Sequence, residues 1–138
     1  MPTKQELITF LETEFPQCRS TLEAVGPATA TLRHAVTDAD LRPGGTVSGP
    51  CMMALADVAL YMAILGEIGI VPLAVTTNLT INFMRKPTAG RDLIAECKLM
   101  KRGRSLAVGE VSLFSEGEHD PVAHVVGTYS IPPKRSES

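Results

Sequence analysis

Apolar side chains recur at helical spacing near the start of the sequence. In residues 3–15 they lie three or four positions apart, as in an amphipathic helix of about three turns. These side chains are Leu7, Ile8, Phe10, Leu11 and Phe15. Thr3 and Glu6 form a capping-box sequence at the start of the stretch, and Pro16 follows its end. We therefore expect an N-terminal helix within residues 1–20.

A second stretch, residues 51–65, is apolar on almost every side of a helix. Such a helix either is buried or spans a membrane. The stretch has about 15 residues where a span needs about 20. Asp57 at its middle would oppose insertion by about 2.5–3.5 kcal/mol. The pattern therefore predicts a buried core helix, with no part in a membrane. Ser48 or Gly49 can cap its start, with Pro50 in the first turn, and Gly66 or Gly69 ends it.

Alternation with a period of two predicts strands elsewhere. Residues 28–36 form the first, and residues 74–84, 92–101, 106–115 and 122–131 form four more. In residues 74–84 one face carries Val75, Thr77, Leu79, Ile81 and Phe83, and the other carries Thr76, Asn78, Thr80, Asn82 and Met84. Short turns join the last four strands, so we expect them to form an antiparallel meander.

These elements predict an α+β fold, in which a curved antiparallel sheet of five to six strands surrounds one long central helix. A helix of about 16 residues is about 24 Å long and a ten-residue strand about 33 Å, so the sheet can cover the helix along its length. One sheet cannot cover a helix that is apolar on every side, and we expect a second subunit to do so. Residues 1–138 are interpreted as a single domain with a short frayed tail at 132–138.

Length and composition narrow the class of protein. With 138 residues, 44% of them apolar, and a net charge of −2, the chain fits one folded domain and not a disordered segment. Its near-neutral charge and its 4% of aromatic residues argue against a nucleic-acid binder. Cys18, Cys51 and Cys97 are odd in number and fit no metal-ligand spacing. With no signal-peptide core at the N-terminus, we expect a cytoplasmic protein without a metal site, whose cysteines are small buried side chains.

Charge is unevenly distributed along the chain. Within residues 43–84 the only charged side chains are Asp57 and Glu67. Residues 85–104 then carry seven basic side chains against two acidic ones. An apolar block is thus followed by a locally positive one.

Asp57 is the residue that most needs an explanation. An ionised carboxylate within an apolar helix costs several kcal/mol unless it is paired, hydrogen-bonded or neutralised. It either caps or pairs structurally within the core, or it works in an apolar cleft as a nucleophile or general base. Residues 50–65 contain no other acid or base for such work.

The start of the same helix offers a second chemical feature. Its first backbone N–H groups have no partner within the helix and attract a developing oxyanion. Gly49 lets a substrate carbonyl approach closely, although Ser48-Gly49-Pro50 can also be an ordinary cap. Gly49 and Asp57 are eight residues apart, about 12 Å of helical rise, so one subunit could not easily place both at one carbonyl carbon. A twofold axis could bring Gly49 of one subunit to Asp57 of another.

Three segments of the chain, residues 41–50, 54–57 and 80–87, carry a resemblance to a known family. Together they are similar to the hotdog-fold acyl-CoA thioesterases, most closely to the type of phenylacetate degradation within the 4-hydroxybenzoyl-CoA thioesterase superfamily. The resemblance covers roughly residues 25–131. It implies hydrolysis of an acyl-CoA thioester by a homodimer or homotetramer, with no cofactor beyond the coenzyme A of the substrate.

The resemblance also implies roles for particular residues. Gly49 corresponds to the oxyanion donor and Asp57 to the catalytic carboxylate. Ser48 stands at the family's histidine position, and Thr76 at the position that orients the attacking water in some members. The candidate contacts to coenzyme A and the acyl group are Arg42, Asn78, Arg85, Lys86, Lys101, Arg102, Arg104, Met53 and Tyr61. The basic side chains among them are equally well interpreted as solvated turns, and the apolar ones favour a medium-chain or aromatic acyl group.

The chain departs from the family pattern at three positions. Ser48 replaces the histidine, Pro50 replaces the second glycine of the motif, and Arg42 replaces a frequent asparagine. These changes leave open an alternative, a non-catalytic hotdog module that binds acyl-CoA without turnover. A dehydratase or hydratase of the same fold is a third option. Such enzymes present an Asp/His pair, and no histidine is near Asp57 in the sequence.

Overall fold

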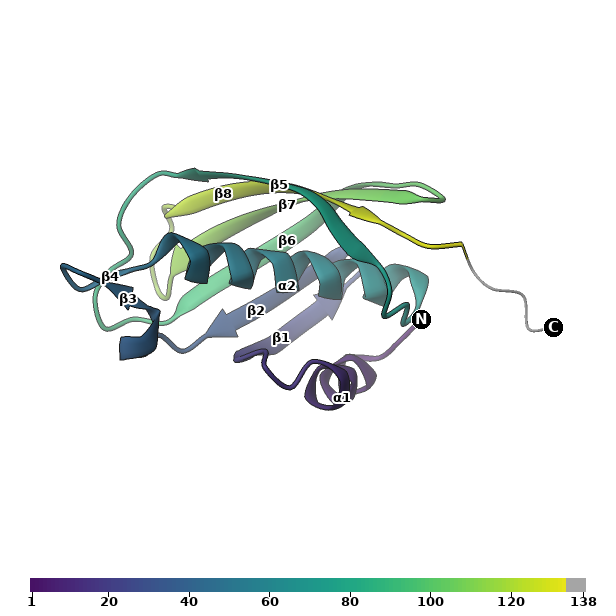
Figure 1. Cartoon of the computed structure of the whole chain (residues 1–138), viewed down its shortest axis with the longest axis horizontal. Helices are drawn as coiled ribbons and strands as arrows, with labels where there is room; N and C mark the ends of the chain where they lie inside the picture. The colour runs from purple at the N-terminus through teal and green to yellow at the C-terminus, as the bar shows by residue number, and fades with distance from the viewer. Residues whose placement is uncertain (134–138) are drawn as a thin grey trace.

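A long helix lies across one face of a six-stranded antiparallel sheet (Figure 1). The computed structural model describes residues 1–133. Helix α1 (Lys4–Glu14) precedes strands β1 (Ser20–Gly26) and β2 (Thr29–His34). The 3-10 helix η1 (Asp38–Asp40) and a hairpin of β3 (Leu41–Arg42) and β4 (Thr46–Val47) lead into helix α2 (Gly49–Ile68). The remaining strands are β5 (Val75–Phe83), β6 (Leu93–Arg102), β7 (Leu106–Ser115) and β8 (Ala123–Ser130).

The sequence pattern predicts most of these elements correctly. The N-terminal helix is confirmed together with its capping box, in which the Glu6 N–H donates to Thr3 Oγ1 at 3.1 Å and the Thr3 N–H donates to Glu6 Oε1 at 2.9 Å. Strand β2 and strands β5 to β8 lie within two residues of their predicted bounds. Of the predicted tail at 132–138, residues 134–138 lie outside the described part of the chain.

The predicted start of helix α2 is confirmed, with Ser48 as the cap and Pro50 in the first turn, and of the two predicted ends the helix continues through Gly66 to Gly69. The hydroxyl of Ser48 caps it by accepting from the Cys51 N–H at 3.2 Å. Gly69 ends it with a φ of 98°, a conformation that glycine adopts without strain. Among the described helices, α2 is the one long and apolar enough to cross a membrane, and 61% of the residues in its most apolar stretch are buried inside the protein. The prediction of a buried core helix is confirmed.

The strand order corrects the predicted meander. The order is β1-β2-β6-β7-β8-β5, so β5 pairs with β8 at one edge of the sheet and does not lie beside β6. Only β6, β7 and β8 form a meander in the described chain. A period of two identifies a strand but does not say which strand it pairs with, and the connection from β5 to β6 crosses the width of two strands.

Strand β1 is absent from the sequence prediction. Leu22 is its only buried residue, and a bulge between Leu22 and Ala24 interrupts its pairing with β2. An edge strand with a bulge has no regular alternation of apolar and polar residues, which explains why the pattern does not indicate it.

Two paired glycines let α2 lie close to the sheet. Gly109 of β7 and Gly127 of β8 are direct cross-strand partners. A Cβ atom on either glycine would come within 2.6 Å of a methyl carbon of Leu60, which is completely buried on α2. The two missing side chains therefore make room for Leu60, and the helix approaches the middle of the sheet.

Replacing Gly127 with Ala tests this close approach. The added methyl should overpack Leu60 and lower the free energy of unfolding by about 1–3 kcal/mol, measured by denaturant titration. In a Leu60→Ala background the same substitution should cost clearly less, because the crowded side chain is gone. Strictly additive effects of the two substitutions would contradict the proposed contact.

Candidate active site

Asp57 lies near the middle of α2, and its half-buried carboxylate faces β5 and β8. The Thr76 hydroxyl donates to Oδ1 at 2.6 Å, and the Tyr129 hydroxyl donates to the same oxygen at 2.9 Å. Oδ2 has no hydrogen-bond partner within residues 1–133. The carboxylate is held at one oxygen and open at the other, which suits a nucleophile or a general base.

A β-bulge brings Thr76 to this carboxylate. The pairing of β5 with β8 shifts between Thr76 and Asn78, so Thr77 is an extra residue in β5. Thr76 consequently faces α2, and so does Leu79, whose side chain meets Leu60 at Gly127. The regular alternation predicted for residues 74–84 is wrong at this point, because a bulge re-aims the side chains around it.

Asn78, one of the predicted ligand contacts, therefore lies on the face away from Asp57. Its Oδ1 accepts a hydrogen bond from the Thr80 hydroxyl at 3.3 Å. The strand pattern placed Thr76 and Asn78 on one face, and the bulge separates them.

Tyr129 is the functional candidate that the sequence analysis misses. It is 3% exposed, and its ring stacks on that of Tyr61 with centroids 5.7 Å apart and an interplanar angle of 18°. Burial, together with the negative charge of Asp57, raises the pKa of Tyr129 above its usual range, so the hydroxyl remains a donor. The sequence does place a tyrosine in the predicted strand 122–131. Because a buried tyrosine hydroxyl needs a hydrogen-bond partner, this residue could have been identified as a candidate.

Met53 and Tyr61 lie one helical turn on either side of Asp57. Tyr61 is buried, and its hydroxyl donates to the Pro72 carbonyl at 2.9 Å. Phe10 of α1 packs edge-on against the same ring, with centroids 5.9 Å apart. Met53 is 36% exposed. Met53 is therefore accessible to a ligand, whereas Tyr61 supports the site from behind.

The N-terminus of α2 carries the second predicted group. The Gly49 N–H has no acceptor in the part of the chain that the structure describes, whereas the Ser48 hydroxyl is occupied as the helix cap. A Cβ on Gly49 would lie 3.1 Å from Cζ of Phe83, so the Phe83 ring packs over this residue. The geometry leaves the Gly49 N–H as an available donor, with the helix dipole behind it.

Gly49 and Asp57 belong to one uninterrupted helix. Eight residues of helix separate them by about 12 Å along its axis. Within one chain, the donor and the carboxylate cannot meet at a single carbonyl carbon.

A buried network lies beside the start of α2. Asp40 is 2% exposed, and its carboxylate accepts from the Thr37 N–H at 2.9 Å and contacts His34 Nε2 at 2.9 Å. Arg19 forms an ion pair with the other carboxylate oxygen. Burial alone would raise the pKa of Asp40, but the hydrogen bonds from Thr37, Arg19 and His34 hold it well below its usual range. The sequence pattern does not indicate this network, because its members come from different elements.

The network also fixes the position of the oxyanion candidate. The backbone carbonyl of Asp40 accepts from the Ser48 N–H at 2.8 Å. Since Ser48 directly precedes Gly49, the buried Asp40 ties the entry of α2 to the end of β2.

One cluster within residues 1–133 could hold a metal ion. The ligand atoms of His34, Asp40 and Cys51 lie within 4.8 Å of one another. Arg19 already supplies a positive charge to Asp40. Burial and the charge of Asp40 raise the pKa of the Cys51 thiol to about 11, so the thiol is protonated at neutral pH. We interpret the cluster as a hydrogen-bonded network.

The predicted basic contacts fall into two separate groups. Arg85 and Lys86 follow the end of β5, whereas Lys101, Arg102 and Arg104 lie at the turn from β6 to β7. The strand register places these groups at opposite ends of the sheet, about 30 Å apart for strands of this length. Within one chain they cannot form a single phosphate site.

Some of these cations already have partners. Arg102 donates to the Glu67 carbonyl at 3.1 Å, near the C-terminal end of α2, and lies 3.7 Å from the Glu67 carboxylate. Arg85 lies 3.5 Å from the carboxylate of Asp120. Arg42, at the β3–β4 hairpin, is exposed to solvent.

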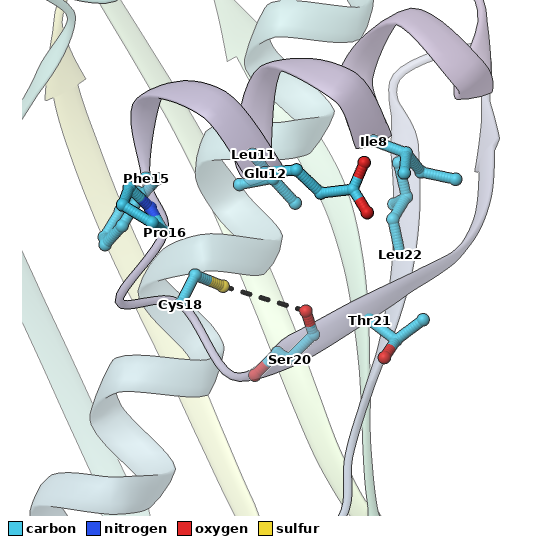
Figure 2. Close-up of a pocket in the computed structure, with 9 residues that line it drawn as sticks. All are labelled: Ile8, Leu11, Glu12, Phe15, Pro16, Cys18, Ser20, Thr21 and Leu22. Carbon is cyan, nitrogen blue, oxygen red and sulfur yellow. Dashed lines mark hydrogen bonds between the residues drawn. The ribbon is translucent and has the colours of Figure 1, made fainter.

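A hollow of about 290 Å³ lies between α1 and β1 (Figure 2). Figure 2 shows Cys18 at its edge, with its Sγ 3.8 Å from the Ser20 carbonyl oxygen. Strand β1 is at one edge of the sheet, whereas β5 and β8, which hold Asp57, are at the other. The hollow is therefore separate from the carboxylate site.

The family model described as "Thioesterase superfamily" matches residues 44–122. A candidate thioesterase from Silicibacter sp. TM1040, known from its crystal structure, is 51% identical, with a TM-score of 0.87 over 94% of this chain and 92% of that one. None of the curated proteins matches the chain.

Two more distant solved structures share the fold. Thioesterase superfamily member 2 from zebrafish is 19% identical, with a TM-score of 0.84 over 96% of this chain and all of that one. A mutant of the phenylacetic acid degradation protein PaaI from Thermus thermophilus is 25% identical, with a TM-score of 0.73 over 90% of this chain and 99% of that one. The predicted arrangement of a six-stranded antiparallel sheet and a long central helix is confirmed.

The buried Asp40 predicts a specific dependence of stability on pH. Because its folded-state pKa lies below the unfolded value of about 4, its ionised form stabilises the fold above that pH, and this contribution is lost as the pH falls further. From pH 7 to pH 3 the free energy of unfolding should fall more steeply in the wild type than in Asp40→Asn. Exposed Asp38→Asn is the matched control and should follow the wild type. Parallel curves for wild type and Asp40→Asn would contradict this account.

Proposed function

The chain belongs to the thioesterase superfamily, and we propose that it hydrolyses the thioester of an acyl-coenzyme A to the free acid and coenzyme A. The observation that carries this proposal is the carboxylate of Asp57. Thr76 and Tyr129 hold its Oδ1, and its Oδ2 is free of protein partners in the described chain. No histidine or other base within residues 1–133 shares the Asp57 hydrogen bonds, so the carboxylate itself would do the work.

The reaction can be written with Asp57 as general base. Oδ2 removes a proton from water while the water oxygen bonds to the thioester carbon. The negative charge that develops on the carbonyl oxygen is stabilised by a backbone N–H such as that of Gly49. The carbon–sulfur bond then breaks, and the sulfur of coenzyme A takes the proton. If Asp57 acts as nucleophile instead, Oδ2 bonds to the same carbon, and the carbon–sulfur bond breaks to release coenzyme A as its thiolate. Water then cleaves the resulting anhydride to the free acid and restores the Asp57 carboxylate.

Both routes need the N–H and the carboxylate at one carbon, so we propose a twofold dimer in which Gly49 of the partner subunit faces Asp57. Two features support a second copy on this side of the molecule. Strand β5 is an edge strand, and its ends expose Val75 at 55% and Phe83 at 53%. On α2, Met53 and Ala54 are exposed on the same stripe as Asp57. An uncovered apolar edge strand is prone to pair with another chain.

Pairing of two copies along β5 would also bring the basic groups together. When two β5 strands pair antiparallel, the two sheets run in opposite directions. The sheet end of one subunit that carries Arg85 and Lys86 then lies beside the other end of the sheet of the partner subunit. That end carries the basic turn between β6 and β7. We propose that the phosphates of coenzyme A bind between these positive ends.

The acyl group would lie along the exposed part of α2. Met53 is the accessible apolar side chain one turn before Asp57, and its flexible thioether suits a chain or ring of variable shape. A medium-chain or aromatic acyl group fits this environment. The similarity to a protein of phenylacetic acid degradation supports the aromatic option.

Replacing Asp57 with Asn tests the proposed chemistry. Asn keeps the shape and can still accept from Thr76 and Tyr129, but it cannot act as base or nucleophile. We expect kcat to fall by about 100- to 10,000-fold on the best substrate of an acyl-CoA panel, measured as release of free thiol. Turnover close to that of the wild type would refute the role. If the wild type binds acyl-CoA tightly and releases no thiol, the chain is the non-catalytic binding module instead.

Charged substitutions on β5 test whether the active site needs a second subunit. The double variant Thr80→Lys/Asn82→Lys places repelling charges along the exposed edge. It should sediment as a monomer and lose at least about 100-fold in kcat/KM, because each Asp57 lacks its oxyanion donor. Thr21→Lys, on the exposed edge strand β1, should change neither property. A monomeric variant with full activity would contradict the dimeric site.

A further inference from the structure

We propose that Tyr129 is a positioning residue of the thioester hydrolysis: together with Thr76 it fixes Oδ1 of Asp57 so that Oδ2 faces the reacting atoms. The inference rests on the proposed function and adds to it a residue from β8. Its basis is that two hydroxyls from neighbouring strands converge on one oxygen of the same carboxylate, at 2.6 and 2.9 Å.

A carboxylate needs hydrogen bonds to fix its orientation, because rotation about its last torsion is only weakly restricted. The terminal torsion of aspartate has broad, roughly twofold minima, so a lone carboxylate exchanges its two oxygens freely. Two donors on Oδ1 favour one orientation, and the half-buried setting strengthens both hydrogen bonds. Thr76 and Tyr129 are direct partners in the β5–β8 ladder. Their two hydroxyls therefore reach Asp57 from adjacent strands.

Tyr129 is itself held rigidly. Its ring is almost fully buried and stacked on Tyr61. The hydroxyl of Tyr61 is in turn bonded to the Pro72 carbonyl at 2.9 Å, and Phe10 packs against the same ring. The phenol of Tyr129 also lies 3.3 Å from the backbone oxygen of Asp57. Its donor is thus aimed at one short segment of α2, and a chain of aromatic contacts keeps it there.

The same hydrogen bond could instead serve only to attach α2 to β8. A purely structural bond and a positioning bond differ in what their loss changes. Loss of a structural bond lowers the melting temperature and leaves the turnover of folded protein intact. Loss of a positioning bond lowers kcat while KM stays constant, because the carboxylate acts on the reacting atoms and not on the bound acyl-CoA.

Tyr129→Phe separates these possibilities, because it keeps the stacked ring and removes only the hydroxyl. We expect kcat on the best acyl-CoA to fall by about 10- to 100-fold, the effect of one hydrogen bond to a charged group, with KM within about twofold of the wild type. Ser115→Ala is the control for stability. Ser115 is 1% exposed and accepts from the Thr88 N–H at 2.8 Å, at the end of β7 away from the Ser130 end of β8 that carries Tyr129. It should lower the melting temperature without lowering kcat.

A companion pair of variants examines the other donor. Thr76→Val should reduce kcat to a similar degree, and Thr76→Ser, which retains the hydroxyl, should restore most of it. If Tyr129→Phe does not fold, 3-fluorotyrosine at position 129 keeps the ring and the hydroxyl while strengthening the donor. A change in its kcat at constant KM then supports the proposal, and an unchanged kcat overturns it.

Failure of the inference and failure of the proposed function give different results. A folded Tyr129→Phe variant with wild-type kcat overturns the inference alone, provided that the wild type is active and Asp57→Asn is not. A wild type that hydrolyses no thioester overturns the proposed function, and the role of Tyr129 with it.

Discussion

One constraint organises this protein: the only carboxylate in the first four turns of an apolar helix is half-buried and needs hydrogen-bond donors on the side that faces the sheet. Asp57 sits on α2 among buried side chains, and an unsatisfied carboxylate there would cost several kcal/mol. The sheet meets this requirement from two strands, through Thr76 on β5 and Tyr129 on β8. The paired glycines under Leu60 let the helix lie close to the strands that carry these two side chains. The packing of α2, the hydrogen bonds of Asp57 and the proposed chemistry thus all depend on the close contact between α2 and the sheet.

The sequence predicts the elements of this fold better than their connections. Helical and strand periods are local, so α1, α2 and five strands can be read directly from them. Pairing depends on distant residues, and the place of β5 beside β8 has no local signal. Strand β1 is missed because its bulge and its single buried residue remove the alternation.

For the candidate site, too, the sequence indicates residues with a local signal and does not indicate those brought together only by folding. Asp57 and Gly49 are found from sequence because a charge in an apolar helix and a glycine at its start are unusual in themselves. Tyr129 and Asp40 are ordinary residues in strand and loop patterns, and only the packed structure brings them to α2. The bulge at Thr77 has no signature in the alternation of residues 74–84, yet it decides that Thr76 and not Asn78 meets the carboxylate.

The central claim is that Oδ2 of Asp57 attacks the thioester carbon, or activates the water that does so, while Thr76 and Tyr129 hold Oδ1. A crystal structure with an acyl-CoA analogue in which a methylene group replaces the thioester sulfur tests it most directly. The account predicts the analogue's carbonyl carbon either about 3–3.5 Å from Oδ2, for a nucleophilic Asp57, or separated from Oδ2 by one bridging water, for a general base. In both cases the two hydroxyls remain on Oδ1 and the N–H of Gly49 of the partner subunit lies on the carbonyl oxygen. An analogue bound away from Asp57, or one that meets Oδ1 after displacing the two hydroxyls, would contradict it.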